Sequence, residues 1–276
     1  MKTLIAGPWV GEFGWELFAW HGYVRALSKN FEKTVVISRN NSESLYTDFA
    51  DEFFSFDALG GLPDAFFMHN VSIEQCLKTA IREYNIPLTK DTTLLVPRRI
   101  GIPPHTHYSQ HVLLGENLLQ PLYVQLGHEK TRTYDVIFHV RRRELRKEDN
   151  WSAENWLKLR ELLGKYKVAC IGTSKESGWI EGTDDLRDIP LGELTTVLRN
   201  AGCGFGPSSG PMHLMSLCGL PHVVWSIVQN KRRYEENWNP LDTKVLFLSD
   251  HEWHPSAEYV YERFLEWQEF DGGVNA

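Results

Sequence analysis

The sequence predicts an α/β fold with two Rossmann-like domains that face each other across a cleft. Short apolar runs alternate with helical patterns along the chain, as in successive βαβ units. The 276 residues suffice for one large or two small domains, and the alternation restarts after a polar, proline-containing stretch near the middle. With 42% hydrophobic and 24% charged residues, the composition is that of a globular protein and excludes disordered and fibrous classes.

The first half of the chain begins with one clear strand, turn and helix. Residues 3–6 predict the strand and residues 7–14 predict the turn. The segment after this turn predicts a helix. One face of this helix is apolar, because large side chains recur at steps of four and three residues, namely Phe13, Leu17, Trp20, Val24 and Leu27. Residues 34–38 predict the next strand, and weaker signals beyond it predict strands at residues 65–68 and 93–96 and a helix at residues 73–84.

The second half repeats the pattern after a boundary that we place near residue 125. Ser152 predicts a helix N-cap, before a helix that carries Trp156, Leu159 and Leu163. Strands are predicted at residues 134–140, 168–171, 204–206, 221–226 and 244–248, and further helices at residues 191–200, 211–217 and 256–267. The expected domains are residues 1–124 and 125–250. Residues 251–276 are expected to form a C-terminal helix that can pack back on the first domain.

Charge, cysteine usage and the N-terminus indicate a cytoplasmic protein. The net charge is −7, which disfavours a general nucleic-acid coat and leaves room for a local basic groove. The four cysteines form no CxxC pair and are expected to be reduced. Glu12 and Glu16 interrupt the apolar N-terminal run where a signal peptide would continue, and no stretch approaches the length of a membrane span.

The most informative motif is the stretch from Gly204 to Trp225. It reads as a short strand, the small-residue turn Pro207–Gly210, a proline at the start of a helix, and an apolar helix. Such a turn directs backbone N–H groups and the positive helix end at a ligand above it, and the serine hydroxyls add donors. A phosphate suits this arrangement. The alternative is a plain strand-to-helix turn in which the serines only cap the helix.

This stretch resembles a motif of glycosyltransferase family 9, the heptosyltransferase-like enzymes. GPSSGPMHLMSLCGLPHVVW matches the family pattern, and YDVIFHVR, NWSAENWLKL, GTSKE and DIPLGELTTVLRNAG agree in order, over about residues 134–227. The resemblance implies the GT-B fold, an acceptor-side first domain, and a second domain that binds a nucleotide-sugar. Lys147 is the nearby substitute for a family lysine that is missing before Trp151. The donor residues that the resemblance implies are Lys147, Thr173, Ser208, Ser209, Gly210, Met212 and His213.

A second motif, VGEFGWELF, follows the first strand. Gly11 and Gly14 let the backbone approach a ligand, Trp15 can stack on a sugar, and Glu12 and Glu16 lie one helical turn apart. In the resembling family a carboxylate of the first turn is a candidate general base, and Glu12 matches it best, with Glu16 in reserve. The alternative for either glutamate is an ordinary carboxylate at a helix start, which the helix dipole stabilises.

A third feature is the basic run Arg141–Arg143 at the end of a predicted strand. Strand ends of open α/β sheets line the binding crevice, so Arg141 is expected to neutralise a leaving diphosphate, and the others to be solvated. His105, His107 and His111 have metal-like spacing, but no carboxylate or cysteine lies near them. No Asp-x-Asp triplet, G-x-G-x-x-G or P-loop occurs, so neither a metal nor a bound cofactor is predicted.

The sequence therefore predicts an inverting, metal-independent glycosyltransferase, hexosyl- or heptosyltransferase-like. Its donor is a nucleotide-sugar, used as a co-substrate, and its acceptor carries a hydroxyl group, on a saccharide or on modified DNA. One alternative is a DNA-modifying glycosyltransferase acting on a hydroxylated base, motivated by the clusters Arg98–Arg99, Arg141–Arg143 and Lys231–Arg233. The other is a non-catalytic nucleotide-sugar binding protein. The sequence leaves open the sugar, the nucleotide base and the acceptor.

Overall fold

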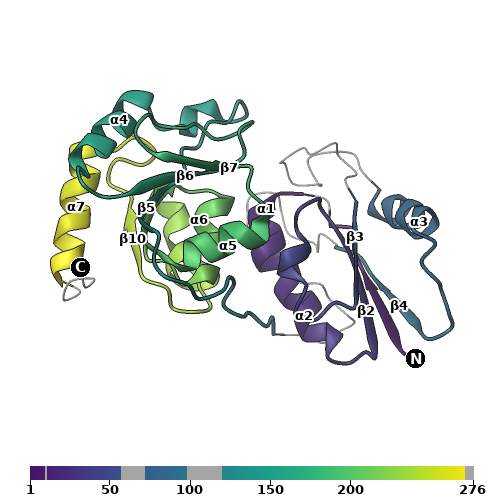
Figure 1. Cartoon of the computed structure of the whole chain (residues 1–276). Coiled ribbons are helices and arrows are strands. Elements are labelled where there is room, and N and C mark those ends of the chain that lie inside the picture. The colour runs from purple at the N-terminus through teal and green to yellow at the C-terminus, as the bar shows by residue number, and fades with distance from the viewer. Residues whose placement is uncertain (10, 57–71, 98–119, 271–276) are drawn as a thin grey trace. The chain divides into compact units, whose positions relative to one another are not determined.

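The computed structural model describes residues 1–9, 11–56, 72–97 and 120–270 (Figure 1). The chain divides into two compact units, Met1–Tyr123 and Val124–Ala276, each with its own parallel sheet. The strand predicted at residues 65–68 and the three histidines at 105, 107 and 111 lie outside the described residues. Within the described part, no helix is long and apolar enough to cross a membrane.

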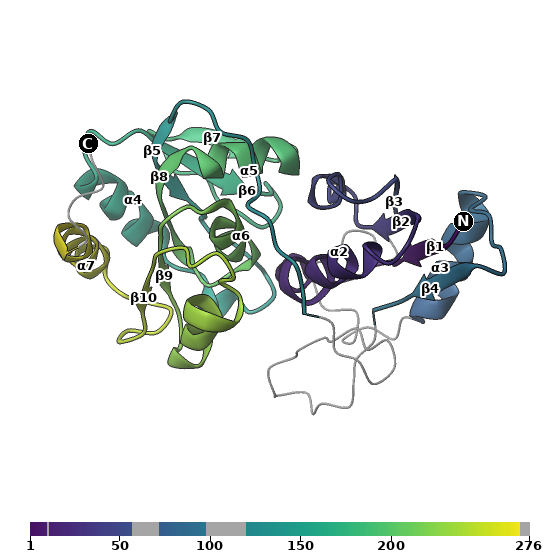
Figure 2. The same ribbon diagram turned by 90° about the horizontal axis from the view of Figure 1, so that it is seen from below.

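Unit 1 contains a four-stranded parallel sheet in the order β3-β2-β1-β4. The helical segments α1 and α2 cover one face of this sheet and α3 covers the other (Figures 1 and 2). The chain moves outward from β1 to β3 and then returns to the far side of β1, so strand order reverses between β1 and β4. The bounds are β1 Thr3–Ala6, α1 Phe13–Trp15, α2 Gly22–Ser28, β2 Lys33–Ser38, β3 Glu52–Ser55, α3 Ile73–Glu83 and β4 Thr92–Leu95.

The predicted first helix forms, and it is buried on nearly all sides. A π-helical stretch, η1 (Glu16–His21), joins α1 to α2, so helical backbone runs from Phe13 to Ser28. The predicted apolar face is buried at Leu17, Trp20, Val24 and Leu27. Charged side chains of the segment are buried as well, and Arg25 donates to both carboxylate oxygens of Asp48, at 2.8 and 2.9 Å. Burial of the whole segment therefore depends on paired polar groups as well as on apolar packing.

Unit 2 contains a six-stranded parallel sheet in the order β10-β9-β8-β5-β6-β7. The chain fills one half of the sheet from β5 to β7 and the other half from β8 to β10, which is the Rossmann arrangement. Figures 1 and 2 show α4 and α7 on one face and α5 and α6 on the other. The bounds are β5 Tyr134–Phe138, α4 Ala153–Leu162, β6 Val168–Gly172, β7 Asp184–Arg187, α5 Leu191–Arg199, β8 Ala201–Pro207, α6 Gly210–Cys218, β9 His222–Trp225, β10 Val245–Leu248 and α7 Ala257–Phe270.

A cluster of aromatic side chains fills the core under α4 and α7. The ring centroids of Trp151, Trp156 and Trp225 lie 4.6–5.5 Å apart, and all three side chains are buried. Ser152 caps α4 as predicted, because its hydroxyl accepts the backbone N–H of Asn155 at 3.2 Å. Phe264 of α7 is buried in the same core. The sequence predicts a separate C-terminal segment of residues 251–276, whereas α7 of this segment belongs to the core of unit 2.

The four cysteines are free thiols, as predicted. Cys170, Cys203 and Cys218 are buried in unit 2, and burial raises the pKa of each thiol. Cys76 on α3 is half-buried.

Two strands of the structure, β3 and β7, were not predicted from the sequence, and both lie at sheet edges.

Candidate functional site

The candidate site of unit 2 lies where the strand order of its sheet reverses. β5 and β8 are parallel neighbours, so the segments that follow them leave the sheet at the same edge. These segments are residues 139–150 after β5 and Ser208–Gly210 after β8. Ligands of open α/β sheets bind at such a point, outside the carboxyl ends of the strands. The predicted donor residues of these two segments therefore share one edge of the sheet.

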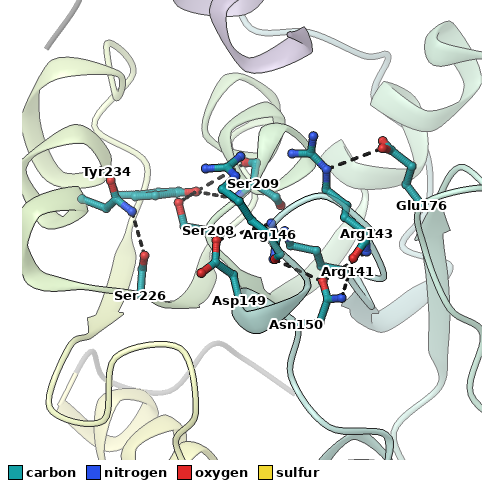
Figure 3. Close-up of polar contacts among 11 residues, drawn as sticks. Arg141, Arg143, Arg146, Asp149, Asn150, Glu176, Ser208, Ser209, Ser226 and Tyr234 are labelled. Atoms are coloured by element: carbon teal, nitrogen blue, oxygen red, sulfur yellow. Dashed lines mark hydrogen bonds and ion pairs between the residues drawn. The ribbon is translucent and has the colours of Figure 1, made fainter. Parts of the chain in front are cut away.

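The turn from β8 into α6 is held by Tyr234, a residue of the short helical turn Arg233–Asn237. The Tyr234 hydroxyl accepts the backbone N–H of Ser209 at 3.0 Å and donates to the Ser208 hydroxyl at 3.1 Å (Figure 3). Burial raises the pKa of Tyr234 to about 12, so the phenol keeps its proton. In the described part of the chain, the N–H groups of Gly210 and Met212 have no hydrogen-bond acceptor. These two donors at the start of α6 are available to an anion.

Two further predicted donor residues are buried under this turn. Met212 packs beneath β8, where a Cβ added at Gly206 would lie 2.7 Å from its sulfur. The His213 ring stacks on Tyr234 with centroids 4.0 Å apart, and burial holds its pKa well below the usual range. Both side chains support the turn from below. These two residues would therefore contact a ligand through their backbone groups and not through their side chains.

A buried histidine that the sequence analysis did not single out lies beside the turn. His139 follows β5, and its Nδ1 lies 2.9 Å from the Ser209 hydroxyl. Its Nε2 lies 3.3 Å from the hydroxyl of Ser177. Burial, together with the charges of Arg141 and Arg143, lowers the pKa of His139 to about 3, so the ring is neutral near pH 7.

The basic loop after β5 is organised around the buried guanidinium of Arg141. This group donates to the side-chain oxygen of Asn150 at 3.2 Å and to the carbonyl of Arg146 at 3.3 Å, and it pairs with Asp149 at 3.5 Å (Figure 3). Burial lowers its pKa to about 10, which still leaves it charged. Asn150 also closes the loop by bonding both backbone groups of Arg143, at 3.1 and 2.8 Å.

Arg141 therefore fixes the loop, while other cations of the loop are exposed. Lys147 lies in the exposed turn η4 (Lys147–Asp149). Arg146 is exposed and adopts a left-handed backbone conformation, with φ 55°. Thr173, after β6, begins a turn in which its carbonyl accepts the N–H groups of Glu176 and Ser177. Arg141, Lys147 and Thr173 stay predicted donor residues.

In unit 1 the VGEFGWELF motif leads from β1 into α1. Glu12 is half-buried and stands at the N-cap of α1. The Gly11 carbonyl accepts Nη1 of Arg39 at 3.3 Å. Gly14 and Trp15 are buried, so the indole of Trp15 offers little surface to a sugar in this conformation.

Glu16 differs sharply from Glu12, because it is completely buried and surrounded by donors. The hydroxyls of Ser38 and Tyr46 donate to its Oε1, and the Ser42 hydroxyl donates to Oε2 at 2.9 Å. Arg39 lies 4.0 Å from Oε2. The carboxylate thus joins the first helical segment to the end of β2, which is a structural task. Both glutamates remain candidates, and this geometry favours Glu12 as the one that can reach a ligand.

The described residues hold no cluster of three histidine, cysteine, aspartate or glutamate side chains of the kind that binds a metal ion. The groups missed by sequence reasoning are His139, Asn150 and Tyr234. Each acts through a partner between 7 and 70 positions away in the chain, as in the pairs His139–Ser209 and Asn150–Arg143. No local motif marks such pairs.

The chain matches no protein-family model and no curated protein sequence. Its structure is nevertheless similar, over nearly the whole chain, to solved glycosyltransferases. A family 9 glycosyltransferase from Veillonella parvula superposes with a TM-score of 0.62 at 14% identity, covering 96% of each chain. The E. coli heptosyltransferase WaaC with ADP gives 0.60 at 13%, covering 97% of this chain and 99% of that one. The E. coli ADP-heptose LPS heptosyltransferase II gives 0.59 at 13%, covering 99% and 100%. These likenesses confirm the predicted α/β fold with two Rossmann-like sheets, of the GT-B type.

Proposed function

We propose that this chain is a glycosyltransferase that transfers a sugar from a nucleotide-sugar to a hydroxyl acceptor with inversion at the anomeric carbon. The observation that carries the proposal is the turn Ser208–Gly210 at the point where strand order reverses. The free N–H groups of Gly210 and Met212 and the hydroxyls of Ser208 and Ser209 suit a diphosphate. The whole-chain likeness to family 9 structures supports the same assignment. One of those structures contains ADP, and we take ADP as the first nucleotide to test.

On the donor side, the reaction needs donors aimed at the charge that develops on the leaving diphosphate. The N–H groups of Gly210 and Met212 supply neutral donors, and the helix start adds a partial positive charge. Lys147 and Arg146 lie on the loop that leaves the same sheet edge, and they supply full positive charges. We propose that these groups take the place of a metal clamp, in keeping with the lack of an Asp-x-Asp triplet.

On the acceptor side, we assign the general base to Glu12. The carboxylate takes the proton of the acceptor hydroxyl while the oxygen attacks the anomeric carbon. The new bond forms on the face opposite the bond to the diphosphate, which breaks and releases the nucleoside diphosphate. Glu12 suits this task better than Glu16, because three hydroxyls already occupy the buried Glu16 carboxylate.

The first test is calorimetric titration with ADP of the wild-type chain and of two glycine variants. Gly210→Val places a branched side chain at the first position of α6, where it would cover the free N–H groups, so we expect at least a tenfold loss of affinity. Gly192→Val is the matched control, because Gly192 also lies in the first turn of a helix, α5, which follows the edge strand β7 and not the switch-point strands β5 and β8. Equal affinity of the Gly210 variant and the wild type would contradict the donor assignment.

A second measurement separates an enzyme from a binding protein. The enzyme releases ADP from ADP-heptose when an acceptor is present, whereas a non-catalytic binder gains thermal stability from the nucleotide without releasing product. The same assay run with UDP- and GDP-sugars identifies the nucleotide. Binding without turnover for every donor and acceptor tried would favour the non-catalytic alternative.

A further inference from the structure

Ser209 occupies a helix N-cap position without acting as a cap. An N-cap serine ordinarily accepts an N–H of the first helical turn through its hydroxyl. Here the backbone of Ser209 is extended, with φ −167° and ψ 169°, and the side chain makes no capping bond. Its hydroxyl lies instead 2.9 Å from Nδ1 of His139. The hydroxyl is thus diverted from the helix to a buried imidazole.

His139 lies in a space that two glycines keep open. A Cβ at Gly206 would lie 3.1 Å from the His139 carbonyl and 3.3 Å from its Cβ. A Cβ at Gly172 would lie 3.3 Å from the His139 ring and would collide with the Ser177 hydroxyl. His139 and Ser177 are each less than 6% exposed. The ring therefore has one fixed orientation, with Ser209 at one nitrogen and Ser177 at the other.

A neutral imidazole carries one proton, so its two nitrogens have opposite roles. If Nε2 carries the proton, it donates to Ser177, and the Ser209 O–H is used up in donating to Nδ1. If Nδ1 carries the proton, it donates to the Ser209 oxygen, and the Ser209 O–H is free to donate elsewhere. In that second arrangement the Ser177 O–H donates to Nε2, so every buried group still has a partner.

We propose that His139 is a positioning residue, which acts through Ser209 on the diphosphate of the donor. Its Nδ1–H donates to the Ser209 oxygen, and the Ser209 O–H then donates to a phosphate oxygen above the start of α6. This inference rests on the proposed function, since it takes the diphosphate to lie over Ser208–Gly210. A hydrogen bond from a hydroxyl to a charged phosphate is among the stronger neutral-donor contacts. His139 itself neither touches the donor nor exchanges a proton with it.

The test uses two replacements of His139 that each keep one of its contacts. The asparagine amide reaches only as far as Nδ1, so His139→Asn keeps a donor for Ser209. The glutamine amide reaches to Nε2, so His139→Gln keeps the Ser177 contact and loses the one to Ser209. We expect His139→Asn to bind ADP within about threefold of wild type. His139→Gln and Ser209→Ala should each weaken ADP binding by about 10- to 100-fold, the range for a lost hydrogen bond to a charged group.

The double variant shows whether His139 works through Ser209. If it does, His139→Gln/Ser209→Ala binds ADP about as weakly as the weaker single variant, because both remove the same contact. His222→Gln is the control for the loss of a buried imidazole, since the His222 Nδ1 bonds the Leu220 carbonyl and not the turn. That control should lower thermal stability and leave ADP affinity within about twofold.

Several results would overturn the proposal. These are ADP affinity of His139→Gln within threefold of wild type, equal losses in the asparagine and glutamine variants, or additive losses in the double variant. If His139→Gln does not fold, Ser209→Ala decides alone, because it removes the same hydroxyl contact, and unchanged ADP affinity in that variant overturns the proposal. Wild-type protein that binds neither ADP nor another nucleoside diphosphate refutes the donor assignment and this inference together.

Discussion

Removal of the Glu16 carboxylate should destabilise the protein far more than it affects catalysis. Glu16→Ala leaves the three hydroxyls of Ser38, Ser42 and Tyr46 buried without their acceptor. Each such group costs about 1–3 kcal/mol when it is left unsatisfied, so the total is about 3–6 kcal/mol after partial relaxation. That is a large part of the roughly 5–15 kcal/mol that stabilises an ordinary domain.

Glu16→Gln should be much milder. The amide oxygen still accepts two hydroxyls, and only the group that faces the new NH₂ has to become an acceptor, which a serine hydroxyl can do. We expect a cost of about 1–2 kcal/mol, from the loss of the charge in these bonds. Turnover should stay within a few fold of wild type, because the first helical segment remains joined to the end of β2.

Urea unfolding followed by tryptophan fluorescence measures both changes. With a slope of roughly 2 kcal/mol per molar urea, Glu16→Ala should lower the midpoint by about 2 M and Glu16→Gln by less than about 1 M. Hydrogen exchange should localise the loss to α1, α2 and β2. Glu43→Ala, at an exposed position of the same unit, is the control and should shift stability by less than about 0.5 kcal/mol. A wild-type midpoint for Glu16→Ala, or a hundredfold loss of turnover in a fully stable Glu16→Gln, would refute the structural assignment.

Four further outcomes are expected. Glu12→Gln should lower kcat by about 10²–10⁴ with ADP affinity nearly unchanged, in an assay of nucleoside diphosphate release, and full turnover would remove Glu12 as the base. Asn150→Ala removes three hydrogen bonds of the basic loop and should cost about 2–4 kcal/mol in urea unfolding, so an unchanged midpoint would show the loop to be held otherwise. Acidification from pH 7 to pH 5 should destabilise the protein, because His139 and His222 have folded pKa values of about 3 and about 4, below their ordinary 6.5. The contribution of these two neutral histidines to the free energy of unfolding is complete above pH 6.5 and is lost toward pH 3–4. Each histidine should lose about 2 kcal/mol of this contribution by pH 5, and equal urea midpoints at pH 7 and pH 5 would contradict this expectation. Duplex DNA should not bind at low salt, given the net charge of −7, whereas binding that weakens steeply with salt would favour the DNA-modifying alternative.

The strands and helices that the sequence predicted are those with an apolar signature. Residues 134–138 and 168–171 are buried strands, and they were read directly from their apolar runs. β7 was missed because its sequence is DDLR, which lies half-exposed at a sheet edge and therefore carries no alternating apolar pattern. Strand propensity in the sequence identifies a strand when both of its faces are packed and its side chains are therefore apolar. An edge strand packs against fewer neighbours, so its side chains can be polar and its sequence carries no such pattern.

The site was predictable only where one local motif contains it. The turn Ser208–Gly210 and its helix were found, because strand, small residues, proline and apolar helix follow one another directly. The interactions that determine its chemistry join distant segments, as Tyr234 does with Ser209. The sequence showed the charge of Arg141 at a strand end but not its burial or its contacts with Asp149 and Asn150, and its contact with a diphosphate stays a prediction.

The unequal burial of the four thiols makes this protein suitable for site-directed fluorescence work without cysteine removal. Thiolate is the species that reacts with maleimides, and in unit 2 the three buried thiols have raised pKa values and no access to reagent. Cys76 on α3 retains partial access. A maleimide dye at neutral pH should therefore attach at a single position in the first unit, leaving the turn Ser208–Gly210 of the second unit chemically untouched.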